Sequence, residues 1–250
     1  MGFNKDIDQG VHFLTDDERT AVFYTSSHTG VIYDYVKKDQ ILLQGHCNQI
    51  TATACSEDKK WVVTADSGDD SMLIIWDSFV GTPVRTFLNP HPNGVRAMDL
   101  SVDNQYIVTI GADQPQTISL WDWTNQNEDG PICSEVNNTV DPRYLNFWIK
   151  FNPNNHFELI ANSQQRLEIY NWVPGNPKFM YYAPRVDPTD FTGAERADCD
   201  LTKSVFIPGT EMAVTGTEGG DIIVWDKSLI LEGIGEPNEK RLIKVVTLNT

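Results

Sequence analysis

Histidines are the side chains whose spacing could most readily support catalysis or metal binding in this 250-residue chain. Five are present, and none forms the H-E-x-x-H pattern through which one helix face binds zinc. His46 and His91 are 45 positions apart instead, and each precedes an asparagine by two residues (Asn48 and Asn93). Such a recurrence indicates a structural repeat rather than a catalytic pair.

Thiols and carboxylates give no stronger indication of chemistry. The four cysteines, Cys47, Cys55, Cys133 and Cys199, contain no C-x-x-C pair, which favours reduced thiols over a zinc site. The acidic run 66–70 lacks the ligand order and the closing glutamate of a calcium-binding EF-hand loop. No G-x-S-x-G turn and no phosphate-binding loop occurs. We therefore expect no catalytic residue, no metal and no cofactor.

One short phrase recurs along the whole chain. A β-rich apolar run ends in an aromatic residue followed by Asp or Asn, and the final residues lie at 34, 77, 122, 171 and 226. The five phrases are Val31–Asp34, Leu73–Asp77, Ile118–Asp122, Leu167–Asn171 and Ile222–Asp226. A period of about 40–45 residues that ends in Trp-Asp is the WD40 signature of a β-propeller.

The second and third units align without a gap at an offset of 45 residues. Nine positions are identical between 46 and 77 and their counterparts: His46, Asn48, Ala52, Ser56, Asp58, Val63, Thr64, Trp76 and Asp77. Each unit contains short β-branched and aromatic runs between polar turns, which predicts four strands per unit. The fold class is therefore an all-β WD40 propeller, in which neighbouring four-stranded blades must stack to bury their apolar faces.

Five blades of roughly this length fill the chain, with boundaries near 1–45, 46–89, 90–139, 140–182 and 198–250. Residues 183–197 are expected to form an inter-blade loop. WD propellers usually close with seven blades, within a range of about four to eight. We therefore expect part of a larger propeller, seven-bladed or double; a closed five-bladed ring is the alternative.

Resemblance to WD repeats implies structural roles for the recurrent polar residues. In such repeats His, Ser or Thr, Asp and Trp form a hydrogen-bonded chain that fastens the loop before each blade. The residues placed in these positions and in the closing Trp-Asp phrases are His46, Thr64, Asp70, Trp76, Asp77, His91, Thr109, Trp121, Asp122, Thr215, Trp225 and Asp226. Pro115 and Gly219 occupy the acidic position in the third and fifth units. We expect units that lack a member to hold their loops less firmly.

Aromatic side chains outside the repeat core are candidates for partner contacts. They are Trp123, Trp172, Met180, Tyr181, Tyr182 and Phe191. Aromatic residues and methionine are enriched at protein interfaces. The same residues could instead pack between blades or cover an edge.

Net charge restricts the partners. The chain carries 19 basic and 35 acidic residues, a formal charge of −16. This excess disfavours binding to nucleic-acid phosphates or to an anionic membrane surface. It also disfavours direct docking on the acidic face of a microtubule unless a basic partner mediates the contact. The N-terminal segment has no basic region followed by an apolar stretch, so no signal peptide is expected.

Part of the sequence resembles one WD-repeat family specifically. Ser56–Asp58, Thr64–Gly68, Ile74–Phe79 and Phe151–Pro153 are similar to the large ciliary WD-repeat protein of the calmodulin- and spoke-associated complex, a cilia- and flagella-associated protein. The resemblance implies a non-enzymatic scaffold in the cytoskeleton of motile cilia, near the base of a radial spoke of the axoneme. Its partners would be other axonemal proteins, namely radial spoke base components and subunits of that complex.

Two alternatives are compatible with the repeats. A WD40 adaptor outside cilia, such as a ubiquitin-ligase substrate receptor or a trafficking subunit, would share the fold and would be found in cells without motile cilia. An enzyme would need polar groups that converge on the central channel, and no such set recurs in the units.

Overall fold

The computed structural model describes residues 4–191, 198–227 and 239–248. These residues form five four-stranded antiparallel sheets, which confirms the predicted all-β propeller class. Two single-turn 3-10 helices, η1 (Pro142–Tyr144) and η2 (Pro188–Asp190), are the only helical segments in these ranges. The chain divides into two compact units, Met1–Asn138 and Thr139–Thr250, which are described separately.

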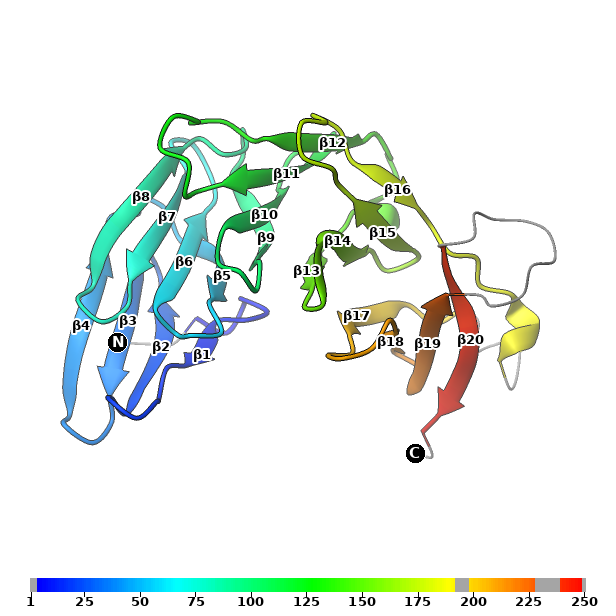
Figure 1. Ribbon diagram of the computed structural model, residues 1–250, viewed down its shortest axis with the longest axis horizontal. Coiled ribbons are helices and arrows are strands. Elements are labelled where there is room, and N and C mark those ends of the chain that lie inside the picture. The colour runs from blue at the N-terminus through cyan, green and yellow to red at the C-terminus, as the bar shows by residue number, and fades with distance from the viewer. Residues whose placement is uncertain (1–3, 192–197, 228–238, 249–250) are drawn as a thin grey trace. The chain divides into compact units, whose positions relative to one another are not determined.

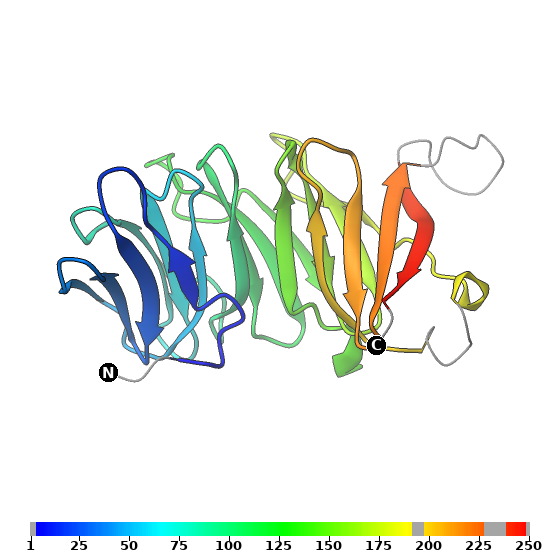
Figure 2. The ribbon, with the colours of Figure 1, turned by 90° about the horizontal axis from the view of Figure 1, so that it is seen from below.

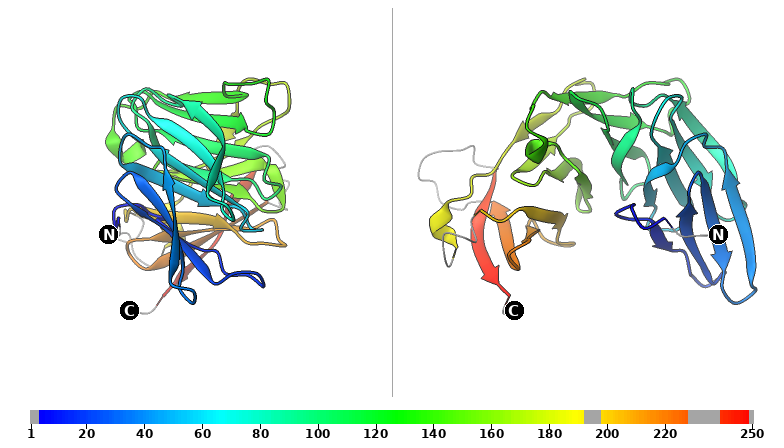
Figure 3. Two further views of the ribbon diagram at one scale, coloured as in Figure 1. Left: turned by 90° about the vertical axis from the view of Figure 1, so that its left-hand side faces the viewer. Right: turned by 180° about the vertical axis from the view of Figure 1, so that it is seen from behind.

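The first unit contains three sheets, shown in blue, cyan and green in Figure 1. Blade 1 consists of β1 (Val11–Phe13), β2 (Ala21–Ser26), β3 (Thr29–Asp34) and β4 (Asp39–Gln44). Blade 2 consists of β5 (Ile50–Cys55), β6 (Trp61–Asp66), β7 (Met72–Asp77) and β8 (Thr82–Leu88). Blade 3 consists of β9 (Val95–Leu100), β10 (Tyr106–Gly111), β11 (Gln116–Asp122) and β12 (Cys133–Asn137). Within each sheet the strands follow one another in chain order (Figure 3).

The second unit contains two sheets, coloured from green to red in Figure 2. Blade 4 consists of β13 (Trp148–Asn152), β14 (Asn155–Asn162), β15 (Leu167–Asn171) and β16 (Met180–Tyr182). Blade 5 consists of β17 (Leu201–Phe206), β18 (Ala213–Thr217), β19 (Asp221–Lys227) and β20 (Lys240–Thr247). Of the expected loop 183–197, residues 192–197 lie outside the described ranges.

Burial follows from the position of each sheet in the stack. Blade 2 lies between two other blades, and β6 and β7 are therefore buried on both faces with nearly continuous apolar runs. Its core continues into blade 1 through Phe23 and Leu43, and into blade 3 through Phe87 and Trp121. In blade 5, β18 and β19 instead alternate between buried and half-buried residues. Only one face of blade 5 thus packs tightly, against Ile160 and Ile169 of blade 4.

Candidate functional site

The His46 side chain begins a buried polar chain in blade 2. Its Nε2 lies 2.6 Å from Oγ1 of Thr64, and Nε1 of Trp76 donates to the same oxygen at 2.8 Å. All three side chains are buried, so each hydrogen bond replaces one that water can no longer make. The chain joins the loop before β5 to the two inner strands β6 and β7.

The carboxylate of this chain belongs to Asp66, which corrects the assignment to Asp70. Oδ2 of Asp66 lies 3.2 Å from Nδ1 of His46, and Oδ1 accepts from the backbone N–H of Met72 at 2.5 Å. Asp70 is exposed, because it lies in the β6–β7 turn with φ 57°. Burial raises the pKa of Asp66, but hydrogen bonds from His46 and from backbone N–H groups outweigh it and hold the pKa below its ordinary value.

Blade 3 contains the same histidine, threonine and tryptophan chain. Nε2 of His91 lies 2.8 Å from Oγ1 of Thr109, to which Nε1 of Trp121 donates at 2.9 Å. Gly111 stands where Asp66 stands in blade 2, and a Cβ there would lie 2.8 Å from Nδ1 of His91. Asp113 supplies a carboxylate to the loop, with Oδ1 accepting from the N–H of Asn93 at 2.7 Å, as Asp66 accepts from the N–H of Asn48 in blade 2. The alignment placed Pro115 at the acidic position of blade 3, but Asp113 gives its loop an acidic acceptor.

The histidine of blade 3 is held uncharged. Burial lowers the pKa of His91 to about 4, so the ring is neutral at physiological pH. A neutral ring bonded to Thr109 and enclosed by the blade has no access to a substrate. His91 therefore has a structural role: it connects the loop before blade 3 to β10 through Thr109.

Blades 4 and 5 replace the histidine altogether. In blade 5, Nε1 of Trp225 donates to Oγ1 of Thr215 at 2.8 Å, and Oγ of Ser204 lies 2.7 Å from that hydroxyl. In blade 4 the Tyr170 hydroxyl donates to Oε2 of the buried Glu168 at 2.7 Å, and Arg166 forms an ion pair with the same carboxylate. Different side chains thus satisfy the equivalent buried groups.

Two of the aspartates that close the Trp-Asp phrases, Asp77 and Asp122, cap turns. Asp77 accepts from the N–H of Phe79 at 2.9 Å, and Asp226 accepts from the N–H of Lys227 at 2.7 Å. Asp122 accepts from the N–H and the hydroxyl of Thr124 at 3.1 and 2.6 Å. The Asp77 and Asp122 carboxylates are thus occupied by their own turns.

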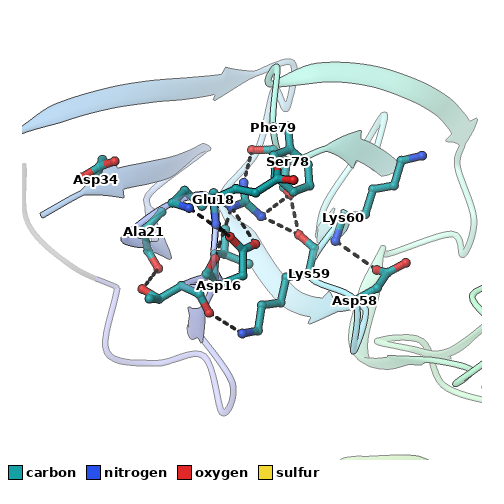
Figure 4. Close-up of polar contacts among 12 residues, drawn as sticks. Asp16, Glu18, Ala21, Asp34, Asp58, Lys59, Lys60, Ser78 and Phe79 are labelled. Carbon is teal, nitrogen blue, oxygen red and sulfur yellow. Dashed lines mark hydrogen bonds and ion pairs between the residues drawn. The ribbon is translucent and has the colours of Figure 1, made fainter. Parts of the chain in front are cut away.

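Arg19 is a blade-to-blade contact that the repeat pattern did not reveal. Its guanidinium donates to the backbone oxygen of Ser78 at 2.7 Å, to Oγ of Ser78 at 2.8 Å and to the backbone oxygen of Lys59 at 2.7 Å. The group also lies 4.0 Å from the ring centroid of Phe79. Figure 4 shows Lys59, Ser78 and Phe79 at this junction. Arg19 lies between β1 and β2, so it connects blade 1 to two turns of blade 2.

Six aromatic or sulfur-containing residues were predicted to contact partners, and three of them are buried. Trp123 is 7% exposed, Trp172 is 3% exposed and Phe191 is 8% exposed. Nε1 of Trp123 donates to the backbone oxygen of Asn104 at 2.7 Å, and Phe191 packs in the core of blades 4 and 5. Trp123 and Phe191 therefore stabilise the fold, which corrects their assignment to a partner surface.

Met180, Tyr181 and Tyr182 form β16 and line an open groove of about 740 Å³ in the second unit. The groove is bounded on the blade 4 side by Phe157, Trp172 and Val173. Glu211, Lys227 and Glu239 bound it on the blade 5 side. Met180 and Tyr181 are about half exposed, at 54% and 50%, while Tyr182 is half-buried.

The residues that the structure describes contain neither a metal centre nor a membrane-spanning helix. No group of three or more His, Cys, Asp or Glu side chains could hold an ion there. Burial raises the pKa of both Cys55 and Cys133 to about 12, which keeps these thiols protonated. In the same ranges, no helix has the length and apolarity needed to cross a bilayer.

Comparison with known proteins decides the family. The family model described as the CFAP251 N-terminal domain matches residues 1–250. The chain belongs to this family. It is 41% identical over 253 aligned residues to cilia- and flagella-associated protein 251 of Tetrahymena thermophila, with 99% of the chain covered. The protein of the same name from Chlamydomonas reinhardtii is 35% identical over 262 residues, with all of the chain covered.

The CFAP251 N-terminal domain represented here is a minor part of those relatives. The chain spans 24% of the Tetrahymena protein and 32% of the Chlamydomonas protein. The solved β-propeller domain of Cps50 (Swd1) from Myceliophteria thermophila matches 94% of this chain and 70% of its own, with a TM-score of 0.60. At 15% sequence identity this likeness concerns the fold alone.

Within this CFAP251 N-terminal domain, sequence reasoning missed Asp66, Asp113, Arg19 and the buried pair Glu158–Lys240. Asp66 could have been found, because side chains two apart on a strand share a face and Thr64 was already placed in the chain. The others join turns or blades that the repeat pattern treats separately, and no spacing rule connects them.

Proposed function

We propose that this domain is a non-catalytic protein–protein interaction scaffold of the motile-cilium axoneme. It docks a radial spoke and the associated complex and thereby supports ciliary motility. The observation that carries the proposal is the similarity over 99–100% of the chain to proteins named cilia- and flagella-associated protein 251. A propeller fold suits the role, because rigid stacked blades present loops for several partners at once.

The internal chemistry of the blades supports a scaffold. His46 and His91, the groups best suited to proton transfer, are buried and bonded to threonine hydroxyls. The carboxylates of Asp77 and Asp122 cap turns. A general acid or base must reach the proton it transfers in a bound substrate. These groups are committed to holding the blades together, so we assign the domain no enzymatic activity.

The proposed partners are radial spoke base proteins and subunits of the calmodulin- and spoke-associated complex. The proposed location is the cytoskeleton of the cytoplasm, in the axoneme of the cilium or flagellum. The charge of −16 favours basic partner surfaces and disfavours nucleic acid and anionic membranes. Contact with the acidic tubulin surface would need a basic mediator.

Domain replacement in Tetrahymena thermophila tests this function. The matching region of the resident relative is exchanged for this chain with a fluorescent tag, and cilia are extracted with detergent. We expect the tagged protein to remain in the axonemal fraction, with radial spokes visible by electron tomography and normal swimming speed. A detergent-soluble or cell-body signal with lost spokes would reject the scaffold role and favour an adaptor outside cilia.

We further propose that the five blades belong to a larger propeller. The face of blade 5 that carries Val205, Val214 and Val224 is half-exposed or exposed, and Lys244 lies beside Val224 on it. Five blades that match 70% of a solved propeller domain correspond to about seven blades in a complete ring. Another blade on this face would bury it as the other blades bury theirs.

Sedimentation velocity tests the larger propeller. The uncovered valines of this face should make the 250-residue chain self-associate as its concentration rises, because exposed apolar patches drive association. Val205→Lys with Val224→Lys should abolish this association, whereas Val11→Lys on blade 1 should not. A wild-type chain that stays monomeric would argue that the face needs no cover.

A further inference from the structure

Four large apolar side chains of unit 2 gather in the groove beside β16. Met180 and Tyr181 are 54% and 50% exposed, and Val173 and Phe157 are 49% and 37% exposed. Single exposed apolar residues are normal on protein surfaces, but a contiguous group in a concave site marks a binding surface. Exposure of these four apolar groups to water is unfavourable, and a bound partner that removes them from water would gain free energy.

The walls of the groove are held in place from behind. Tyr181 stacks on Tyr170 with ring centroids 5.1 Å apart and an interplanar angle of 24°. The Trp172 ring lies 5.0 Å from the Phe157 ring, and its Nε1 donates to the backbone oxygen of His156 at 2.8 Å. The Tyr182 hydroxyl accepts from the N–H of Lys240 at 2.7 Å. A partner would therefore meet pre-formed walls and would not have to order them on binding.

The charges that line the groove are predominantly acidic. Glu158 is neutralised by the buried Lys240, whose Nζ lies 2.7 Å from its Oε1. Glu211 and Lys227 form an ion pair at 3.0 Å on the exposed side. Glu239 adds a further carboxylate to the same side. With the chain charge of −16, this edge favours a cationic rather than an anionic ligand.

We propose that this groove binds an extended segment of a partner protein that carries Lys or Arg next to an aromatic or branched aliphatic anchor. The anchor occupies the space between Trp172, Met180 and Tyr181. The basic group lies toward Glu239 and Glu211, and the exposed ring of Tyr181 can add a cation–π contact. This inference rests on the proposed scaffold function and names the docking surface and the chemistry of its ligand.

Peptide selection against the complete 250-residue chain tests the groove. A phage-displayed library of random ten-residue peptides is selected on the immobilised protein, and the strongest sequence is synthesised with fluorescein for anisotropy titration. We expect enrichment of peptides with Arg or Lys beside Trp, Phe or Leu. Their affinity should fall at least about tenfold with Met180→Ser/Tyr181→Ser, since central aromatic anchors dominate binding energy.

Two further variants separate the anchor from the charge and from general surface effects. Glu239→Gln should weaken the same peptide about two- to threefold and reduce the salt dependence of binding. The control Val84→Ser/Leu88→Ser changes side chains that are 50% and 73% exposed on β8, outside the groove, and should leave affinity unchanged. Selection of acidic peptides, no enrichment, or equal binding to wild type and Met180→Ser/Tyr181→Ser would overturn the proposal.

Other occupants give different results in the same experiment. If the peptide binds at least tenfold more tightly when Leu229, Ile230 and Leu231 are changed to serine, the chain's own segment competes for the groove and the proposal fails. A dimer that disappears in Met180→Ser/Tyr181→Ser by sedimentation would identify a second copy as the occupant and would also overturn it. Failure of the axonemal replacement would reject the scaffold role without changing peptide affinity, so the two outcomes are distinguishable.

Discussion

Lys240 and Glu158 form a buried ion pair between blades 5 and 4. Nζ of Lys240 lies 2.7 Å from Oε1 and 2.9 Å from Oε2 of Glu158, and the side chains are 0% and 9% exposed. Nδ2 of Asn152 donates to Oε2 of the same carboxylate at 2.6 Å. The pair fastens the first residue of β20 to β14, which lies 82 positions earlier in the chain.

Lys240→Met should destabilise the domain by about 3–5 kcal/mol. The substitution leaves the Glu158 carboxylate buried without its counter-charge, and removing one partner of a buried pair is strongly destabilising. Urea unfolding followed by tryptophan fluorescence measures the loss. Lys244→Met, four residues along the same strand and exposed, is the matched control and should change stability by less than about 0.5 kcal/mol.

The double variant Lys240→Met/Glu158→Leu should recover part of that loss. A buried ion pair often contributes little more than apolar residues of similar volume, so most of the single-variant cost is the uncompensated charge. Double-mutant analysis of unfolding free energies measures the coupling. Additive costs for Lys240→Met and Glu158→Leu would show that the two groups do not depend on each other.

Asp66→Asn should lower the free energy of unfolding by about 1–3 kcal/mol, and Asp70→Asn should not change it measurably. Asp66 is fully buried beside His46 and accepts from the N–H of Met72, so an amide in its place turns a donor toward a donor. Asp70 is exposed. Thermal and urea unfolding of the two variants side by side provide the measurement, and the reverse order would restore Asp70 to the hydrogen-bonded chain.

The members of that chain show how far the sequence could be read. Thr64 and Trp76 recur at a fixed offset because blades 2 and 3 use the same hydroxyl and the same indole, so alignment of these units finds them. The carboxylate does not recur at one position. It comes from Asp66 in blade 2 and from Asp113 in blade 3, because Gly111 leaves room for a side chain two residues later.

Contacts between blades could not be predicted from the repeat pattern. Arg19 bonds to Ser78, 59 positions away, and Lys240 bonds to Glu158 across 82 positions. Neither pair recurs in other blades, so internal comparison carries no signal for them. Some of the predicted partner residues are buried and others are exposed, and the sequence could not distinguish them. An aromatic residue such as Trp123 has the same sequence pattern whether it packs against Trp61 or faces solvent.

His91 should make the domain less stable at mildly acidic pH. Its pKa is lowered by burial to about 4 from an ordinary 6.5, so the unfolded chain binds a proton that the folded chain rejects between these values. The stability that His91 contributes is complete above pH 6.5 and falls as the pH drops toward 4. This difference between the folded and unfolded pKa of His91 corresponds to about 3 kcal/mol of unfolding free energy over that pH range.

Replacement of His91 by glutamine isolates this contribution from the titration of carboxylates. Glutamine can still bond to Thr109 but does not titrate, so the difference in unfolding free energy between wild type and His91→Gln should shrink from pH 7.5 to pH 4.5. A constant difference for His91→Gln would show that the His91 ring has the same pKa in the folded and the unfolded chain.

Arg19→Lys should destabilise the junction of blades 1 and 2 by about 1–3 kcal/mol. A lysine ammonium cannot reproduce the forked contacts to Ser78 and Lys59 or stack over Phe79, so backbone oxygens lose charge-assisted bonds. The urea midpoint measures the effect. Arg143→Lys changes a side chain that is 60% exposed and paired only with Asp141 nearby, and it should have no measurable effect.

Amide exchange should show that the loop before blade 3 is as well protected as the loop before blade 2. Sequence comparison predicts a weaker loop in blade 3, because Pro115 stands at the assumed acidic position. The structure gives the N–H of Asn93 a short bond of 2.7 Å to Asp113, whereas the N–H of Asn48 lies 3.2 Å from Asp66. Exchange of these two amides should therefore slow to a similar extent relative to an unfolded chain.

Asp113→Ala tests the cause of that protection. Removing the carboxylate leaves the Asn93 amide without its acceptor, so its exchange should accelerate by about tenfold or more, the equivalent of roughly 1.4 kcal/mol. The amides of β10 and β11, which are bonded to neighbouring strands, should keep their rates. Asp69→Ala in the corresponding turn of blade 2 changes an exposed side chain and should leave Asn48 protected. Rapid exchange of the Asn93 amide in the wild-type domain would show that Asp113 does not substitute for Asp66 as the acceptor. The loop before blade 2 would then be more stable than the loop before blade 3.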